Sequence, residues 1–296
     1  MDQTTPAAPS ARPDVPDLPS VAVTGSTGAV GGQVARLLAA AGVPVRLPAR
    51  SPDRAPDLPG AVVVPMTGYA DRSSVVEALR GTQTLLMVSG AENADRLGEH
   101  RSFIDSAVKA GVQHVVYTSF AGAAEDCTFT LGRDHWATEQ HLRGSGIAWT
   151  FLRDNFYLDF LALLPGEDGV IRGPAGSGRV AAVARADVAA VAAAVLTDPS
   201  AHAGATYDLT GPEALSFPEI ATVVGAHLGR EVTFHDETVE EAYASRRARE
   251  APDWQYDAWV STYTAIAAGE VETVSDDVHR LTGRAPVSLA ELLRQR

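Results

Sequence analysis

A glycine-rich turn near the N-terminus is the part of the sequence that points most directly to chemistry. Gly25, Gly28 and Gly31 recur at three-residue intervals after the apolar residues 21–24, and apolar residues at helical spacing follow from Val30 to Ala41. The first glycine permits a tight turn, the second lets a pyrophosphate approach the backbone, and the third brings the helix close to the strand. The helix N-terminus then attracts the anion. This context predicts a dinucleotide site, with a turn that only redirects the chain as the alternative.

The end of the second predicted strand carries a base where many dinucleotide sites carry an acid. NAD sites usually place Asp or Glu about 20 residues beyond the glycines, where the carboxylate binds the ribose 2′-hydroxyl. Arg50 stands in this region, and with Arg54 it could hold a 2′-phosphate through charge-assisted hydrogen bonds. We therefore predict NADP(H) as the preferred cofactor. Asp53 lies close enough to keep NAD(H) compatible with the sequence, and a solvated loop arginine is the alternative interpretation.

Alternating apolar runs and helical patterns must position these residues. Strands are expected near 21–24, 44–48, 61–64, 84–88, 113–118 and 147–152, and helices near 30–41, 72–80, 94–110 and 133–143. Such alternation is typical of a parallel sheet with helices on both faces. The sequence predicts an α/β fold, a Rossmann-type doubly wound parallel sheet with a smaller C-terminal α/β substrate lobe.

Three segments follow from this pattern. Residues 1–19 are rich in proline and lack an apolar core, which predicts a disordered tail. Residues 20–154 would form the NAD(P)-binding Rossmann domain, with six strands. Residues 155–296, with short strands near 180–183, 205–209 and 231–235, would form a C-terminal substrate lobe packed against it.

Composition argues against several other classes of protein. The net charge of −13 and the lack of a clustered basic stripe argue against nucleic acid as a partner. No apolar run reaches the roughly 18 residues that span a bilayer, and the N-terminus does not resemble a secretory signal, so we expect a cytoplasmic protein without membrane contact. The single cysteine, Cys127, allows no internal disulfide, and the histidines show no metal-ligand spacing, so we predict no metal. The sequence does not specify the oligomeric state.

Further motifs extend along most of the chain. They are Tyr117–Phe120 after the fifth strand, Leu152–Tyr157 after the sixth, His100-Arg101, His135–Gln140, Arg185–Ala189 and Tyr207–Glu213. In this order and spacing, together with the glycine turn and Arg50, they resemble the NmrA-like atypical short-chain dehydrogenases. Within that family the chain is most similar to the type 2 NAD(P)H:quinone oxidoreductases and the triphenylmethane reductases.

The resemblance implies a set of cofactor contacts. The glycine turn would cradle the pyrophosphate, Arg50 would bind the 2′-phosphate, and the end of the fourth strand would border the cofactor. The expected cofactor-binding residues are Gly25, Ser26, Thr27, Gly28, Ala29, Val30, Gly31, Arg50, Met87, Val88, Ser89, Gln140 and Asn155. At position 140 the family normally has a lysine that bonds the nicotinamide ribose. The neutral glutamine is a departure that implies weaker cofactor binding.

The same departure bears on the reaction. Short-chain dehydrogenases of the better known kind pair a tyrosine with a lysine four residues later, which lowers the pKa of the tyrosine that protonates a carbonyl. Trp136 and Gln140 stand at these positions, and the only lysine, Lys109, is expected at the end of another helix. The sequence therefore predicts hydride transfer to an acceptor that needs no strong acid, such as a quinone, a conjugated dye-like cation or an activated alkene. The protein would supply proximity and orientation.

The residues that contact the acceptor or move protons are left open by the sequence. Tyr117 and Tyr157 carry hydroxyls that could protonate a reduced acceptor, with burial against the backbone as the alternative. His135 and Glu139, one helical turn apart, could relay protons or form a surface pair. Aromatic side chains could form a wall for a flat acceptor or pack as core. The expected substrate-lining residues are Phe120, Trp136, Phe156 and Tyr157.

Two classes of function fit these expectations. The first is an NADPH-dependent reductase that transfers hydride to a quinone or similar conjugated acceptor. The alternatives are a non-catalytic protein that binds NADP(H) and reports redox state, and a tailoring enzyme for a specialised polycyclic metabolite.

Overall fold

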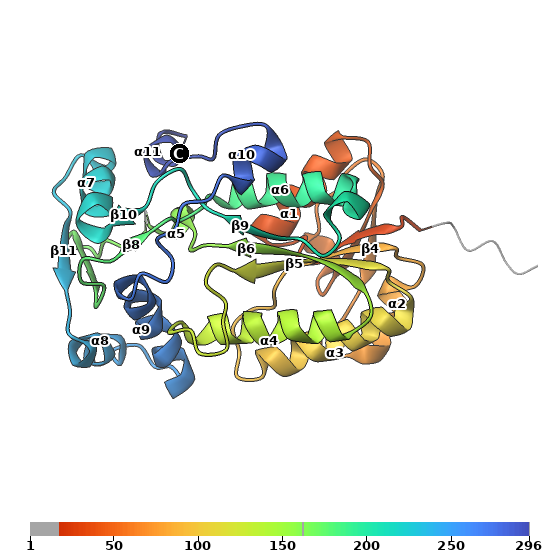
Figure 1. The fold of residues 1–296 in the computed structure, drawn as a ribbon, viewed down its shortest axis with the longest axis horizontal. Coiled ribbons are helices and arrows are strands. Elements are labelled where there is room, and N and C mark those ends of the chain that lie inside the picture. Colours follow the sequence, from red (N-terminus) through yellow and green to blue (C-terminus); the bar gives the residue numbers. More distant parts are fainter. Residues whose placement is uncertain (1–17, 162, 296) are drawn as a thin grey trace, which may run out of the picture.

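A parallel sheet of seven strands forms the centre of the molecule (Figure 1). The computed structural model describes residues 18–161 and 163–295, so the predicted tail lies outside the described residues except for Leu18 and Pro19. The strand order is β3-β2-β1-β4-β5-β6-β9, and all neighbours pair in parallel. The strands are β1 (Val21–Val23), β2 (Val45–Ala49), β3 (Ala61–Pro65), β4 (Thr84–Met87), β5 (His114–Phe120), β6 (Ala148–Asp154) and β9 (Thr206–Leu209). The predicted fold class is confirmed.

The seventh strand corrects the prediction of a six-stranded sheet. β9 was expected in the substrate lobe, but Phe151 to Asp154 of β6 pair with Thr206 to Leu209 along its whole length. The helix before β9, α6 (Arg185–Thr197), likewise returns to the sheet and packs against α1 (Ala29–Ala40). The nucleotide-binding part of the chain therefore includes two elements from beyond Asp154.

Helices cover both faces of the sheet, as Figure 1 shows. The face with α1 and α6 also carries α10 (Asp277–Thr282), and the opposite face carries α2 (Arg72–Leu79), α3 (Arg96–Ala110) and α4 (Thr130–Gly144). Local sequence fixes their ends. The Asp71 carboxylate accepts hydrogen bonds from Ser73 N and Ser74 N at the start of α2, and Gly111 ends α3 with a left-handed φ of +87°.

Side chains alternate across the sheet and build one core on each face. Leu86, Val116 and Leu152 pack with α1 and α6, whereas Leu85, Tyr117 and Phe151 pack with α3. At the carboxyl end of β6, Arg153 continues the α4 face through its bond to Glu139. Successive residues of β5 and β6 therefore serve different helix layers.

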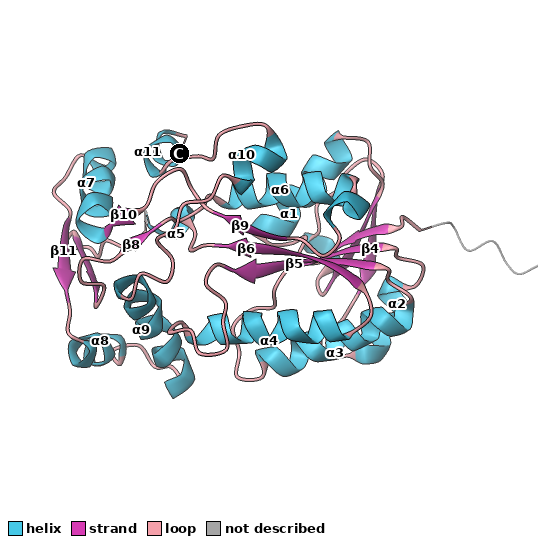
Figure 2. Cartoon of the chain, viewed as in Figure 1, coloured by secondary structure: helices cyan, strands magenta, loops and turns pink. Residues whose placement is uncertain are grey.

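The C-terminal lobe lies beyond the carboxyl ends of β5, β6 and β9 (Figure 2). Its two small sheets pair β8 with β10 antiparallel and β7 with β11 in parallel. Its elements are α5 (Leu158–Leu161), β7 (Val170–Gly173), β8 (Arg179–Val180), β10 (Leu215–Ser216), α7 (Phe217–Leu228), β11 (Thr233–Asp236), α8 (Val239–Arg246), α9 (Asp253–Ala267) and α11 (Leu289–Arg294). The predicted strands near 180–183 and 231–235 correspond to β8 and β11. Two short 3₁₀ turns, η1 (Pro52–Arg54) and η2 (Pro199–His202), complete the described elements.

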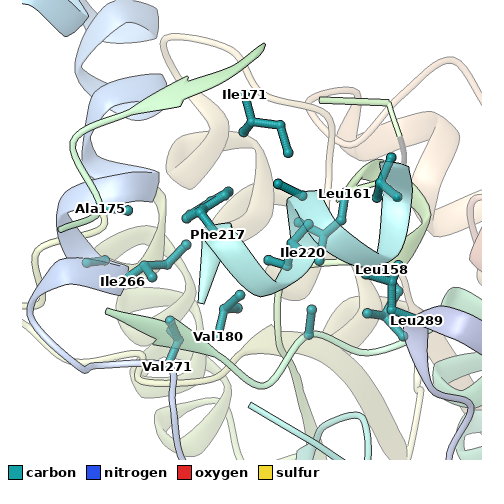
Figure 3. Packing of buried hydrophobic residues seen from close by; sticks show 14 of the residues in the cluster. Leu158, Leu161, Ile171, Ala175, Val180, Phe217, Ile220, Ile266, Val271 and Leu289 are labelled. Atoms are coloured by element: carbon teal, nitrogen blue, oxygen red, sulfur yellow. The ribbon is translucent and has the colours of Figure 1, made fainter. Parts of the chain in front are cut away.

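A separate apolar core holds this lobe together (Figure 3). Phe217 and Ile220 of α7 pack with Ile171 of β7 and with Leu158 and Leu161 of α5. The chain enters this core directly from β6, so the lobe is anchored at the carboxyl edge of the main sheet. Within residues 18–161 and 163–295, no helix has both the length and the apolar character needed to cross a membrane.

Candidate functional site

A cavity of about 620 Å³ opens at the carboxyl edge of the sheet and extends from the end of β3 across β2 and β1 to the end of β4. The strand order reverses between β1 and β4, which is where doubly wound sheets bind nucleotides. Four loops line the cavity: the glycine turn after β1, the segment after β2, the segment after β3, and the segment after β4. Its volume falls within the roughly 300–1,000 Å³ common for small-molecule sites.

The glycine turn has the geometry that its sequence predicts. Gly25 has φ +64°, and a Cβ at Gly31 would lie only 2.5 Å from the carbonyl oxygens of Thr24 and Gly25. Gly28 N donates to Gly25 O at 2.9 Å, so the turn closes tightly at the start of α1. Only glycine fits at position 31, because backbone atoms occupy the space of a side chain.

An anion would find unpaired donors at this turn. No side chain caps the start of α1, and its first turn carries no acidic residue. The Ser26 hydroxyl is buried and has no hydrogen-bond partner among the described residues. Unsatisfied N–H groups at a helix N-terminus, with a buried unpaired hydroxyl beside them, fit a diphosphate.

Arg50 lies on the rim of the same cavity, close to the loop that follows β3. Its Cδ would be 3.9 Å from a Cβ at Gly68, and its charge lowers the otherwise raised pKa of Tyr69. The side chain is exposed and forms no ion pair with any described residue. A free guanidinium at this position fits the 2′-phosphate of NADP(H). Arg54 and Asp53, on η1, are not among the residues that line the cavity.

The predicted cofactor residues divide into three groups. Gly25, Ser26, Thr27, Arg50, Val88 and Ser89 line the cavity. Gly28, Ala29, Val30 and Gly31 complete the turn and the start of α1, and their contact with a cofactor stays a prediction. Met87, Gln140 and Asn155 lie elsewhere.

Met87 and Asn155 are buried and contribute to packing and hydrogen bonding within the fold. Met87 is fully buried in the core beneath α3. Asn155 is buried too, and its Nδ2 donates to Val271 O at 2.9 Å while its Oδ1 accepts from Phe156 N at 2.7 Å. The asparagine therefore ties the end of β6 to the C-terminal lobe, and the structure does not bring it to the cavity.

Gln140 is the clearest correction. Its side chain is exposed on α4, where it borders a separate depression with Asp105 and His141 between α3 and α4. The residue before it, Glu139, is fully buried toward the sheet. One residue corresponds to about 100° of helix rotation, so a neighbour of a sheet-facing residue points away from the cofactor side. The structure therefore does not bring Gln140 to the cavity, and its contact with the nicotinamide ribose stays a prediction.

A hydrogen-bond cluster that the sequence analysis missed joins β1, β4 and the loop after β3. The Tyr69 hydroxyl donates to Val88 O at 2.6 Å and lies 2.7 Å from Thr24 Oγ1, while Val88 N donates to Thr24 Oγ1 at 2.9 Å. The Tyr69 ring stacks on Phe103 of α3 with 4.1 Å between ring centroids. These bonds fix the cavity wall formed by Val88.

A buried histidine, His100, supports the loop after β4. Gly90 N donates to His100 Nε2 at 2.8 Å, so His100 Nδ1 carries the proton and donates to Thr138 Oγ1 at 3.0 Å. Burial, with a smaller effect of the Arg96 charge, lowers the pKa of His100 to about 3. His100 is therefore neutral and acts as a fixed acceptor for the loop.

Arg96 connects the same loop to Tyr117. Its Nε donates to Gly90 O at 3.0 Å, and its guanidinium donates to His135 Nε2 at 2.9 Å. His135 Nδ1 must then carry the proton that it donates to the Tyr117 hydroxyl, 2.9 Å away. Burial first, and then Arg96, lower the pKa of His135 well below its usual value, and burial raises that of Tyr117. Neither His135 nor Tyr117 is therefore free to act as an acid. The sequence analysis had not identified Arg96, because no local pattern distinguishes it.

Glu139 is also occupied, so the predicted surface pair with His135 is wrong. Its carboxylate accepts two hydrogen bonds from Arg153 at 2.8 and 2.7 Å and one from Ser119 at 2.6 Å, and Arg143 lies 3.3 Å away. Both Glu139 and His135 are buried, and they bond different partners. The pair therefore fixes α4 to the sheet, and the contacts of the two side chains form no relay between them.

Two of the residues predicted to form an aromatic wall, Phe120 and Phe156, pack with the apolar core of the C-terminal lobe, and their contact with an acceptor stays a prediction. Phe120 and Phe156 lie 4.9 Å apart and both contact Phe129, at 4.9 and 5.3 Å between ring centroids. Trp136 is half-buried on α4 and is not among the described side chains of this cluster. Tyr157 instead lies 6.1 Å from Phe160, and its hydroxyl donates to the Asp154 carboxylate. The described residues contain no group of three or more potential metal ligands.

Comparison with known proteins agrees with this geometry. Residues 25–199 match the NAD(P)H-binding family. Quinone oxidoreductase 2 of Escherichia coli is 32% identical over 246 residues, which cover 82% of this chain and 85% of that protein. The crystal structure of the E. coli NADPH-dependent quinone oxidoreductase QOR2 complexed with NADPH has a TM-score of 0.85 at 30% identity, covering 93% of this chain and 99% of that chain. Triphenylmethane reductase of Citrobacter sp., complexed with NADP(H), has a TM-score of 0.81 at 31% identity, with coverage of 93% and 99%.

Proposed function

Because the chain belongs to the NAD(P)H-binding family, we propose that it is an NADPH-dependent reductase of quinones or similar conjugated acceptors. The resemblance to type 2 quinone oxidoreductases and triphenylmethane reductases, expected from its motifs, is confirmed. The relatives are named for reduction of a quinone and of triphenylmethane dyes. Both acceptors are conjugated, which supports a small-molecule acceptor of that class for this chain.

One observation carries the cofactor assignment. The unpaired Ser26 hydroxyl, the uncapped start of α1 and the unpaired Arg50 guanidinium all belong to one cavity at the carboxyl edge of the sheet. These donors match the two anionic groups of NADP(H), the diphosphate and the 2′-phosphate. Bound NADPH would supply a hydride to the acceptor.

The protein's own residues supply position and exclusion of water. Val88 and Ser89 border the cavity beside the glycine turn, and the loop that contains them is held by His100 and Arg96 through Gly90. A wall fixed by buried hydrogen bonds keeps its geometry when a ligand binds, which is what hydride transfer requires. The acceptor would enter between this edge and the C-terminal lobe.

Cofactor binding tests this proposal first. Dissociation constants for NADPH, NADP⁺, NADH and NAD⁺ are measured for the wild type, Arg50→Gln and Arg294→Gln, the last on the exposed face of α11. Charged hydrogen bonds contribute about 1.5–3 kcal/mol, so R50Q should weaken NADPH binding about 10- to 100-fold. NADH binding and the R294Q variant should change little. Equal effects of R50Q on NADPH and NADH would contradict the assignment of Arg50.

Turnover is the second test. The wild type is assayed for NADPH oxidation with a panel of quinones, triarylmethane dyes and conjugated alkenes. Steady consumption of NADPH with a quinone or dye is the expected result. Tight NADPH binding without turnover of any acceptor would favour the alternative of a redox-reporting protein. The predicted cytoplasmic location stays a prediction, which cell fractionation would test.

A further inference from the structure

We propose that Glu99, on α3, binds the amino group of the adenine base and so makes the cavity selective for adenine dinucleotides. This inference rests on the proposed function, because it takes NADPH as the ligand of the cavity at the carboxyl edge of the sheet. It deepens that function by naming the residue that recognises the base. The position of Glu99, its lack of protein partners and its charge lead to this assignment.

One end of the cavity must hold the adenosine half of the cofactor. The 2′-phosphate belongs to the ribose of adenosine, so a phosphate bound by Arg50 places this ribose and its base beside the end of β2 and the loop after β3. We call this part of the cavity the adenosine end. Its lining from β2 and from the loop after β3 consists of Pro48, Ala49, Arg50 and residues 66–71.

Glu99 reaches the adenosine end from α3. It lines the cavity, and it lies one helical turn before Ser102 and Phe103. Ser102 Oγ donates to Ala70 O at 3.3 Å. The Phe103 ring stacks on the Tyr69 ring, with 4.1 Å between their centroids. Both side chains therefore face the loop after β3. Residues three and four positions apart share one face of a helix, so Glu99 faces the same loop.

The Glu99 carboxylate is free to bind a ligand. It is half-buried, and within residues 18–161 and 163–295 it forms no hydrogen bond and no ion pair. Asp71, the other acid at the adenosine end, is occupied, because its carboxylate accepts from Thr67 Oγ1 at 2.7 Å and from two backbone N–H groups at the start of α2. The Tyr69 hydroxyl is bonded within the cavity wall. Among the described residues of this end, Glu99 and Arg50 are therefore the polar side chains without a partner.

The charge of Glu99 decides which part of the ligand it can meet. A carboxylate accepts hydrogen bonds and donates none. Beside a bound phosphate it repels the ligand unless the ligand offers it a donor. The adenosine 2′-phosphate offers two such donors, the ribose 3′-hydroxyl and the amino group of the base. Arg50 meets the ribose from the end of β2, whereas Glu99 faces the loop after β3 from α3, so its donor is the amino group.

The hypoxanthine analogue of NADPH isolates this contact. Its base carries an oxygen in place of the amino group, while both sugars, the phosphates and the nicotinamide are unchanged. With the analogue, the Glu99 carboxylate faces an acceptor where NADPH presents a donor. A site built to bond an N–H group of its ligand rejects a ligand that lacks this group, because the polar group of the protein is left unpaired.

Dissociation constants for NADPH and the analogue are measured by calorimetry for the wild type, Glu99→Gln and Glu92→Gln. A hydrogen bond to a charged group accounts for about 10- to 100-fold in affinity, so the wild type should prefer NADPH by that factor. A glutamine accepts from an amino group and donates to an oxygen. E99Q should therefore bind the two ligands with affinities within about 3-fold of each other.

Glu92 is the matched control. It lines the same cavity from the loop after β4, and its exposed side chain also has no partner among the described residues. E92Q removes one negative charge near a bound anion, so it should tighten both ligands by the same factor and leave their ratio unchanged. Glu99 also lies in the first turn of α3, where a carboxylate stabilises the helix. Loss of that effect would weaken both ligands alike, so the ratio reports the contact with the base.

Three results would overturn the assignment of Glu99. They are a preference for NADPH below about 3-fold in the wild type, a wild-type preference that persists in E99Q, and an equal loss of preference in E92Q and E99Q. If the wild type binds neither ligand, the proposed cofactor site itself fails, so the two failures are distinct. R50Q should weaken both ligands by the same factor, since both carry the 2′-phosphate, and that result would support separate recognition of phosphate and base.

Discussion

The protonation state of Asp154 has a direct consequence for stability. The carboxyl has an ordinary pKa of 3.8 and a pKa of about 8 in the folded protein, with burial as the main cause. Between these values the unfolded chain releases a proton that the folded protein keeps. Since the folded state then binds more protons than the unfolded state, the free energy of unfolding must fall as the pH rises from about 4 to about 8. The contribution is complete below pH 4 and is lost by pH 8.

Asp154→Asn should remove this dependence because an amide does not ionise. Each pKa unit corresponds to about 1.4 kcal/mol, so between pH 5 and pH 7 the wild type should lose about 3 kcal/mol relative to D154N. His100 and His135 act in the opposite direction, since their lowered pKa values make the protein more stable as the pH rises toward 6.5. Both histidines are present in both proteins, so their effect cancels in the difference.

The assay is urea unfolding at half-unit steps from pH 5 to pH 8, with Tyr243→Phe as the control. A tyrosine hydroxyl does not ionise in this interval, so the difference between Y243F and the wild type should not depend on pH. The difference between D154N and the wild type should rise steadily. Parallel curves for D154N and the wild type would refute the protonated carboxyl.

Three further outcomes follow from the site. Gly31→Ala should lower the free energy of unfolding by about 1–3 kcal/mol, because its Cβ would lie 2.5 Å from two carbonyl oxygens. Gly28→Ala should lower it less, because the nearest atom to its Cβ would be 3.3 Å away. Equal urea midpoints for the two variants would contradict this prediction. Arg96→Met should lower the free energy of unfolding by about 2–4 kcal/mol, because one buried and one partly buried acceptor lose their donor, and urea unfolding at pH 7 would check this value. Gln140→Lys should change the NADPH dissociation constant less than about 2-fold, since the side chain is exposed on the outer face of α4. Tighter NADPH binding by this variant, measured by calorimetry, would instead support a contact between residue 140 and the nicotinamide ribose.

The main elements of the fold could be predicted because their signals are local. The glycines, the helical spacing of apolar residues and the terminal glycines lie within each element, so six strands and their helices were expected within a few residues of their bounds. β9 was assigned to the C-terminal lobe instead of the main sheet because its place depends on a contact between distant parts of the chain. It has four residues, it follows β6 by about fifty positions, and only its pairing with Phe151 to Asp154 shows which sheet it joins. Such a pairing leaves no local pattern.

The hydrogen-bond network around Arg96 could not be predicted from the sequence, because burial of a charged residue depends on partners that are distant in the chain. Arg96 is 4% exposed, which is rare for an arginine without bonded acceptors, and its acceptors come from Gly90 and from His135, 39 positions along the chain. The spacing of His135 and Glu139 placed them correctly on one helix face. It did not say whether that face met solvent or the sheet, and polar residue types favoured the wrong choice.

Gln140 and Asp154 show that neighbouring residues in a helix or strand point toward different sides of that element. Glu139 and Gln140 are neighbours in the sequence, yet the two side chains point to different sides of α4, and only Glu139 reaches the sheet. In β6 the same argument could have found Asp154 from the sequence. Phe151 and Arg153 alternate with Leu152 and Asp154, so a strand with Leu152 in the α1 core must place Asp154 on the α1 and α6 side. Alternation along a strand therefore predicts the side of the sheet toward which its last side chain points. The match of position 140 to a family motif predicts only which type of residue stands there, and not the direction in which its side chain points.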